Sequence, residues 1–220
     1  LDTHRAAGVP GSVAGMWLAH RRFGSRPWAR LLAPAIALAE RGFALHPRTA
    51  ADFAGEDRNN FRDYFRGGPG DTLRQPELAA TLRRIAAAGA DGFYRGETAR
   101  LIVEEMRRGG GLVTLEDLAG YQAIWRPPVT GVYRGLHVVS MGPPSSGGVG
   151  LIELLNLFER LDARGFITDD GYFLTFAPQY VNLVAELEKR VFADRTEYLG
   201  DPDFVTVPAD LLTSRTYAAR

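Results

Sequence analysis

Cysteine is absent from the 220 residues of the chain. Its absence excludes disulfide bonds, thiolate metal sites and a cysteine nucleophile, because each of these needs the thiol sulfur. A cysteine-free sequence is compatible with a cytosolic protein and also with an exported protein that has no redox role. The composition therefore leaves the compartment open.

Long apolar runs are also absent. A membrane-spanning helix needs about 20 consecutive apolar residues, whereas Arg, Glu or Gly interrupts the apolar stretches of this chain within a turn or two. We expect no membrane span. The chain starts at Leu1 in polar sequence, without the charged and apolar segments of a secretion signal. A helix predicted over Leu211–Arg220 has no stop signal, so both ends are expected to lie inside a longer protein.

An excess of charge of either sign is missing, because 26 Lys and Arg residues balance 26 Asp and Glu residues. Without a net field to attract polyanions, we expect no nucleic-acid partner. The hydrophobic share of 45% and the charged share of 24% are typical of a soluble globular domain. The length fits one large domain or two small ones.

Metal ligands at a useful spacing are missing too. No histidine has a second histidine or a carboxylate at zinc-ligand spacing on a helix. The four histidines are His4, His20, His46 and His137. The glycines at positions 8, 11 and 15 also lack the spacing of a dinucleotide-binding loop. We expect neither a metal nor a cofactor.

The sequence does contain strong helical periodicity. Helices are expected around residues 17–23, 31–42, 78–86, 101–106, 151–161 and 178–192. Two β-branched or aromatic runs, Val129–Tyr133 and Leu136–Ser140, are joined by Arg134-Gly135, which predicts a hairpin with a two-residue loop. The segment Asp52–Pro76 is rich in Asp, Arg, Asn, Gly and Pro and is expected to be a surface connection, within which Phe65–Asp71 cannot hold regular structure.

The most suggestive local chemistry is the loop Ser145–Gly148, between the second predicted strand and a helix. Unpaired amides at a helix start carry partial positive charge and can receive an anion or a substrate carboxylate. A serine that only caps the helix explains the same pattern. Neither Ser145 nor Ser146 has the flanking glycines of a nucleophile elbow. A positive φ is the reason to expect that Gly147→Val would disturb the turn.

Several long segments, taken together and in order, resemble the γ-glutamyltranspeptidase family across nearly the whole chain. Each of them is longer than a short motif that matches by chance. They are GVPGSVAG (8–15), LLAPAIALAERGF (31–43), DGFYRGETARLI (91–102), GGLVTLEDLAGY (110–121), YRGLHVVSMGPPSSGG (133–148) and ADRTEYLGDPDFV (193–205). The stretch Thr168–Val184 follows the family pattern only loosely.

The resemblance implies an N-terminal-nucleophile hydrolase, made as one precursor that cuts itself into a large and a small subunit. Residues 1–220 would be a single, incomplete large-subunit region of an α+β fold, a four-layer αββα sandwich. The nucleophile would be the first threonine of the small subunit, so no catalytic residue is expected in this chain. Its own free α-amine would act as the base. The implied location is periplasmic or extracellular.

The implied partners are the small subunit, a glutathione-like γ-glutamyl donor, and water or an amino acid as acceptor. Ser145, Ser146, Gly147 and Gly148 are the candidate substrate-binding residues, as part of the pocket wall. The helices at 151–161 and 180–191 are expected to cover a sheet supplied mostly by other parts of the enzyme. Three alternatives stay open: a glutaryl or cephalosporin acylase, a poly-γ-glutamate depolymerase, or a non-catalytic helical interaction domain.

Overall fold

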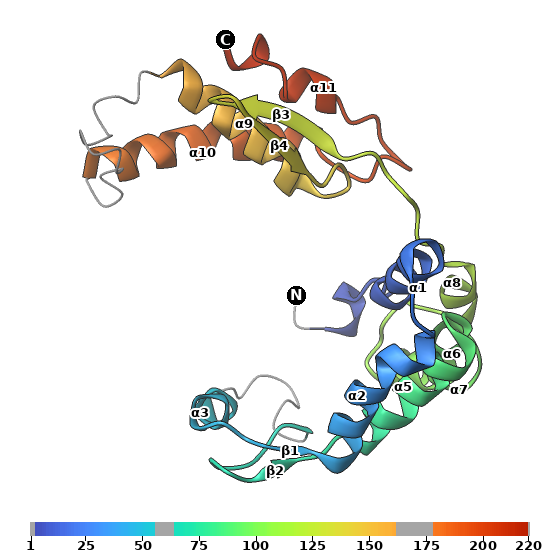
Figure 1. Ribbon diagram of the computed structural model, residues 1–220. Helices are drawn as coiled ribbons and strands as arrows, with labels where there is room; N and C mark the ends of the chain where they lie inside the picture. Colours follow the sequence, from blue (N-terminus) through green and yellow to red (C-terminus); the bar gives the residue numbers. More distant parts are fainter. Residues whose placement is uncertain (1–2, 56–63, 162–177, 220) are drawn as a thin grey trace. The chain divides into compact units, whose positions relative to one another are not determined.

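The computed structural model describes residues 3–55, 64–161 and 178–219. The chain divides into two compact units, Leu1–Ile124 and Trp125–Arg220, which are described separately below (Figure 1). That both belong to one domain of a larger enzyme stays a prediction.

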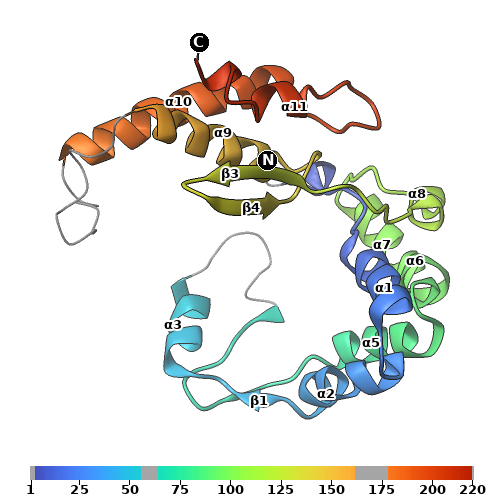
Figure 2. The same ribbon diagram turned by 45° about the horizontal axis from the view of Figure 1, so that its top comes forward.

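The first unit is almost entirely helical. Its helices are η1 (His4–Ala6), α1 (Ser12–Phe23), α2 (Trp28–Arg41), α3 (Pro47–Gly55), α5 (Pro76–Ala88), α6 (Asp91–Tyr94), α7 (Gly96–Arg108) and α8 (Leu115–Gly120). Helices α2 and α5 lie side by side (Figures 1 and 2). The periodicity thus predicted the long helices correctly, whereas the short α6 lies inside what was expected to be only a turn.

Tyr94 is the centre of the first unit's core. Its ring is 5% exposed and stacks on Tyr121 with ring centroids 5.6 Å apart. Its hydroxyl donates to the carbonyl of Pro10 and accepts from the Ala14 amide, at 2.5 and 3.2 Å. A Cβ at Gly11 would lie 2.3 Å from the Tyr121 hydroxyl, so Tyr121 can keep this stacked position only beside a glycine. The glycine-rich segment before α1 is therefore held by a buried tyrosine.

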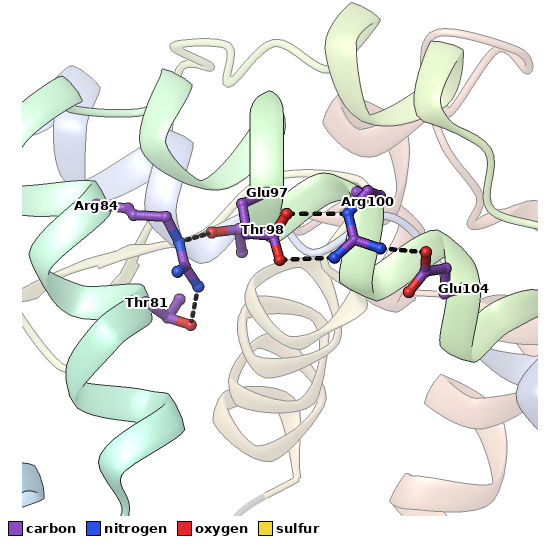
Figure 3. Close-up of polar contacts among 6 residues, drawn as sticks. All are labelled: Thr81, Arg84, Glu97, Thr98, Arg100 and Glu104. Atoms are coloured by element: carbon purple, nitrogen blue, oxygen red, sulfur yellow. Dashed lines mark hydrogen bonds and ion pairs between the residues drawn. The ribbon is translucent and has the colours of Figure 1, made fainter.

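Polar side chains connect α5 to α7 (Figure 3). The Arg84 guanidinium donates to the hydroxyls of Thr98 and Thr81, at 2.8 and 3.0 Å. On the exposed side of α7, Arg100 forms ion pairs with both Glu97 and Glu104. Thr98 is buried and also donates to a backbone carbonyl at 2.8 Å. The contact between Arg84 and Thr98 satisfies polar groups between α5 and α7 and helps to fix their relative position, whereas the Arg100 ion pairs lie within α7.

The expectation that Phe65–Asp71 holds no regular structure is confirmed, whereas the surface connection around it contains short regular elements. Helix α3 continues to Gly55, and strand β2 (Thr72–Leu73) pairs antiparallel with β1 (Phe43–Ala44). Buried Leu45 and Leu73 form a small core there with Ala50 of α3. This burial overrides the local turn signals. Residues 56–63 lie outside the described part.

The second unit contains a hairpin and two long helices. Its elements are β3 (Val129–Tyr133), β4 (Leu136–Ser140), α9 (Ser146–Arg160), α10 (Pro178–Tyr198), α11 (Ala209–Leu212) and η3 (Tyr217–Ala219). The predicted strands and the two-residue loop are confirmed. Arg134 and Gly135 both have positive φ, at 49° and 81°, as a tight hairpin loop requires.

Helix α9 lies against one face of this hairpin, and α10 lies along α9 (Figures 1 and 2). Gly131 of β3 lets the helix approach, since a Cβ would lie 2.7 Å from the Ile152 side chain. Helix α10 ends at Tyr198, beyond the predicted end at residue 192. The loosely matching stretch Thr168–Val184 lies outside the described residues as far as residue 177.

The helix predicted over Leu211–Arg220 is wrong. The chain forms α11 and then the short η3, because side chains take the backbone groups that a continuous helix would pair. Asn156 donates to the Thr213 carbonyl at 2.8 Å, and the Tyr217 amide donates to the Ser214 hydroxyl at 3.1 Å.

Candidate functional site

The loop Ser145–Gly148 connects β4 to the first turn of α9. Ser145 is the N-cap residue, and its hydroxyl accepts a hydrogen bond from the Gly147 amide at 3.3 Å. Its own amide donates to the Gly142 carbonyl at 3.2 Å. The capping role considered from the sequence is therefore present at Ser145.

Ser146 has a different partner. Its hydroxyl accepts from Nε of Arg195 on α10 at 3.0 Å, and the Arg195 guanidinium lies 5.8 Å from the centre of the Phe192 ring. The sequence reasoning missed Arg195, because the two residues are 49 positions apart. The only available signal was that both fall in segments that resemble one family.

The two glycines of the loop differ. Gly148 is buried, and a Cβ at this position would lie 2.0 Å from the Met141 carbonyl oxygen and 2.8 Å from a methyl group of Val129. Gly147 is exposed, and a Cβ would meet only the Ser145 hydroxyl, at 3.6 Å. The expectation that Gly147 has a positive φ is wrong. Close approach of backbone to backbone requires glycine at position 148, not at 147.

In the part of the chain that the structure describes, the loop has no group that would activate a serine for nucleophilic attack. Activating a serine hydroxyl requires a neighbouring base. Within the described residues, neither Ser145 nor Ser146 has a histidine or carboxylate as hydrogen-bond partner. The loop instead presents helix-start amides and a guanidinium, which are groups that favour an anion.

In residues 3–55, 64–161 and 178–219, no group of three or more His, Asp or Glu side chains could hold a metal ion. No helix there is long and apolar enough to cross a bilayer.

Comparison with known proteins gives a consistent result. The family model for gamma-glutamyltranspeptidase matches residues 1–220. A glutathione hydrolase proenzyme from Pseudomonas aeruginosa is 45% identical over 97% of this chain. An acylase ACY 1 proenzyme from Pseudomonas sp. (strain SE83) is 39% identical over 97% of the chain. The crystal structure of Helicobacter pylori gamma-glutamyltranspeptidase superimposes with a TM-score of 0.85 and 41% identity over 98% of the chain.

The chain spans 38% of the length of the P. aeruginosa relative and 63% of the H. pylori chain. The structural likeness confirms the predicted α+β class and the assignment to this fold. Since the family model covers every residue, the chain belongs to the γ-glutamyltranspeptidase family.

Proposed function

We propose that the chain is part of the large subunit of an enzyme that transfers or hydrolyses γ-glutamyl groups. The observation that carries the proposal is the family match over residues 1–220, together with 45% identity to a protein named as a glutathione hydrolase proenzyme. The substrates would be glutathione-like donors, with water or an amino acid as acceptor. A periplasmic or extracellular location is part of the same proposal.

The reaction would use a threonine supplied by the small subunit after self-cleavage. Its hydroxyl attacks the γ-glutamyl carbonyl while its free α-amine takes the proton, and the leaving amine departs with a proton. Water or an acceptor amine then attacks the acyl-enzyme and releases the threonine hydroxyl. This chain supplies no group to that chemistry. Its role is to build the scaffold around the nucleophile.

We assign Ser145, Ser146, Gly147 and Gly148 to the wall of the substrate pocket. The first turn of α9 can direct backbone amides at a substrate carboxylate. Arg195 supports this role, because it holds the Ser146 hydroxyl and adds positive charge beside the helix start. The buried Gly148 fixes the loop against the backbone of Met141.

The exposed face of the β3–β4 hairpin fits the surface that the small subunit would cover. Val132 and Val139 lie on the face away from α9, and 40% and 66% of their surface is exposed. Met141, which follows β4, is 70% exposed. Among the described residues each strand has a partner on one edge only. Added strands could pair there and bury these apolar side chains.

An acylase of the same fold is a second candidate, because a protein named as an acylase proenzyme is 39% identical over nearly the whole chain. The complete enzyme should therefore be assayed with both a chromogenic γ-glutamyl anilide and a glutaryl or cephalosporin amide. We expect faster turnover of the γ-glutamyl substrate. The reverse preference would establish the acylase.

The chain alone should turn over neither substrate. Activity that follows the purified chain through several columns would contradict the proposal, because it would place a nucleophile within residues 1–220. If the complete reading frame encodes no threonine or serine nucleophile after residue 220, the remaining alternative is a non-catalytic interaction domain.

A further inference from the structure

A buried carboxyl group lies in the second unit, away from the loop Ser145–Gly148. Glu153 projects from α9 and is 3% exposed. It forms a side-chain hydrogen bond with Asp194 of α10. Asp194 also accepts a hydrogen bond from the Tyr217 hydroxyl of η3, at 3.0 Å. One acidic pair thus touches three separate elements of the unit.

The contact itself requires a proton. An ionised carboxylate can only accept hydrogen bonds, so two carboxyl groups that bond to each other must hold at least one proton between them. Asp194 already accepts a hydrogen bond from the Tyr217 hydroxyl and is only half-buried. Glu153 is the more buried of the two and loses more solvation energy when it is charged. The proton therefore belongs on Glu153.

A cavity of about 380 Å³ is lined by Glu153, Leu157, Arg190, Ala193, Asp194, Tyr217 and Ala218. Among the described residues that line it, Arg190 of α10 is the only basic one, and it is exposed. The ionisable residues of the other elements packed on α9, which are Tyr133, His137 and Asp210, do not line the cavity.

We propose that the Glu153–Asp194 pair is a pH-sensitive latch between α9 and α10, closed while Glu153 holds its proton and weakened when the proton is lost. Without the proton, two negative charges face each other, and the buried Glu153 can no longer donate a hydrogen bond to Asp194. Helix α10 then separates from α9 more readily. This property is independent of the γ-glutamyl chemistry proposed above.

The direction of the pH effect follows from the pair's environment. Burial, followed by the hydrogen bond to Asp194 and its charge, raises the pKa of Glu153 to about 8. In an open or unfolded state the pKa returns to about 4.5. The contribution to stability is therefore complete below pH 4.5 and is lost as the pH rises from there to about 8.

Hydrogen exchange on the complete enzyme tests the latch. Exchange of peptides from α10 is compared between the wild type and Glu153→Gln at each pH, so that the intrinsic pH dependence of exchange cancels. Gln has a similar volume, and its amide can donate to Asp194 without titrating. We expect the ratio of wild-type to variant exchange to rise about tenfold per pH unit between pH 6 and 8. Glu188→Gln, at an exposed position on α10, should leave the wild-type profile unchanged.

A ratio that does not change with pH would overturn the latch. If Glu153→Gln fails to fold, Asp194→Asn serves instead and should make the pH dependence shallower without abolishing it, because it removes the opposing charge but leaves Glu153 buried. Infrared spectroscopy gives a second readout. The difference between wild type and variant at pH 7 should contain the carbonyl band of a protonated carboxylic acid, and an ionised carboxylate band in its place would refute the assignment of the proton.

Discussion

Glu105 in the first unit and Glu153 in the second are the same amino acid in opposite surroundings. Glu105 lies at the solvent-accessible end of α7, where Arg108 donates to it at 2.5 and 2.7 Å and His4 lies 2.7 Å away. These partners, Arg108 first, lower its pKa to about 2. Glu153 faces a second carboxyl in a buried place, and its pKa rises to about 8.

The comparison shows that partner and solvent, and not residue type, set the charge of a carboxyl group. It also assigns opposite pH responses to the two units. The first unit loses a contribution to stability in acid, and the second loses one as the pH rises through neutrality.

Gly148→Val should have the largest effect, because it displaces the helix that carries Glu153. The new Cβ would lie 2.0 Å from the Met141 carbonyl oxygen, and a backbone atom cannot move aside cheaply. We expect a loss of about 1–3 kcal/mol or more, as for other overpacked sites, with reduced maturation. Thermal unfolding and subunit processing in the complete enzyme measure both effects.

Gly147→Ala is the matched control for this substitution. Position 147 is exposed and has room for a Cβ, so stability should change by less than about 1 kcal/mol. Equal losses of stability for the two substitutions would show that the close approach of Gly148 to the Met141 carbonyl does not restrict the residue at position 148.

Tyr94→Phe should be next in size. It removes the hydroxyl that pairs with the Pro10 carbonyl and the Ala14 amide, and leaving such groups unpaired costs about 1–3 kcal/mol. Because both partners are backbone groups, the loss should be the same at pH 6 and pH 8. Urea unfolding at the two pH values measures it. A loss that grows between pH 6 and pH 8 would show that the contribution of Tyr94 depends on pH, as that of Glu153 is expected to do.

Helix caps allow a finer comparison of the units. Thr114 forms a capping box with Asp117, in which each side chain bonds the other residue's amide at 2.9 or 3.1 Å. Ser145 makes one longer bond. Replacement of either cap by alanine should cost about 0.5–2 kcal/mol, with Thr114→Ala the more costly. If Ser145→Ala folds and matures normally but loses nearly all turnover, Ser145 takes a direct part in the reaction.

Glu105→Gln should have the smallest effect, visible only in acid. The folded-state pKa is lowered, so the contribution of Glu105 is present above about pH 4.5 and is lost as the pH falls toward 2. The variant should therefore have a flatter stability profile in this range than the wild type, with little difference at pH 7. Parallel acid-unfolding curves would contradict this.

The sequence predicted the elements whose causes are local. Arg134-Gly135 between two β-branched runs leads to one tight turn, and the apolar spacing of residues 151–161 leads to one helix. Contacts between residues far apart in the sequence could not be derived in this way. No periodicity indicates that Arg195 meets Ser146 or that Asp194 meets Glu153.

The candidate loop was found but only partly understood. Its position before α9 and the Ser145 cap follow from composition, since serine and glycine favour helix starts. The distinction between Gly147 and Gly148 does not, because it depends on where the Met141 carbonyl lies. The prediction of a helix over 211–220 was wrong for a similar reason. Asn156 of α9 donates to the Thr213 carbonyl, which lies near it only in the folded chain.

The compact arrangement of β3, β4 and α9 has a consequence for the order of folding. These elements are contiguous in sequence, and the hairpin closes through a two-residue loop, so little chain entropy is lost when they meet. Strands β1 and β2, by contrast, must first bring together the two ends of residues 45–71. We therefore expect the segment 129–160 to fold early during synthesis and to present two open strand edges to the sequence that follows it.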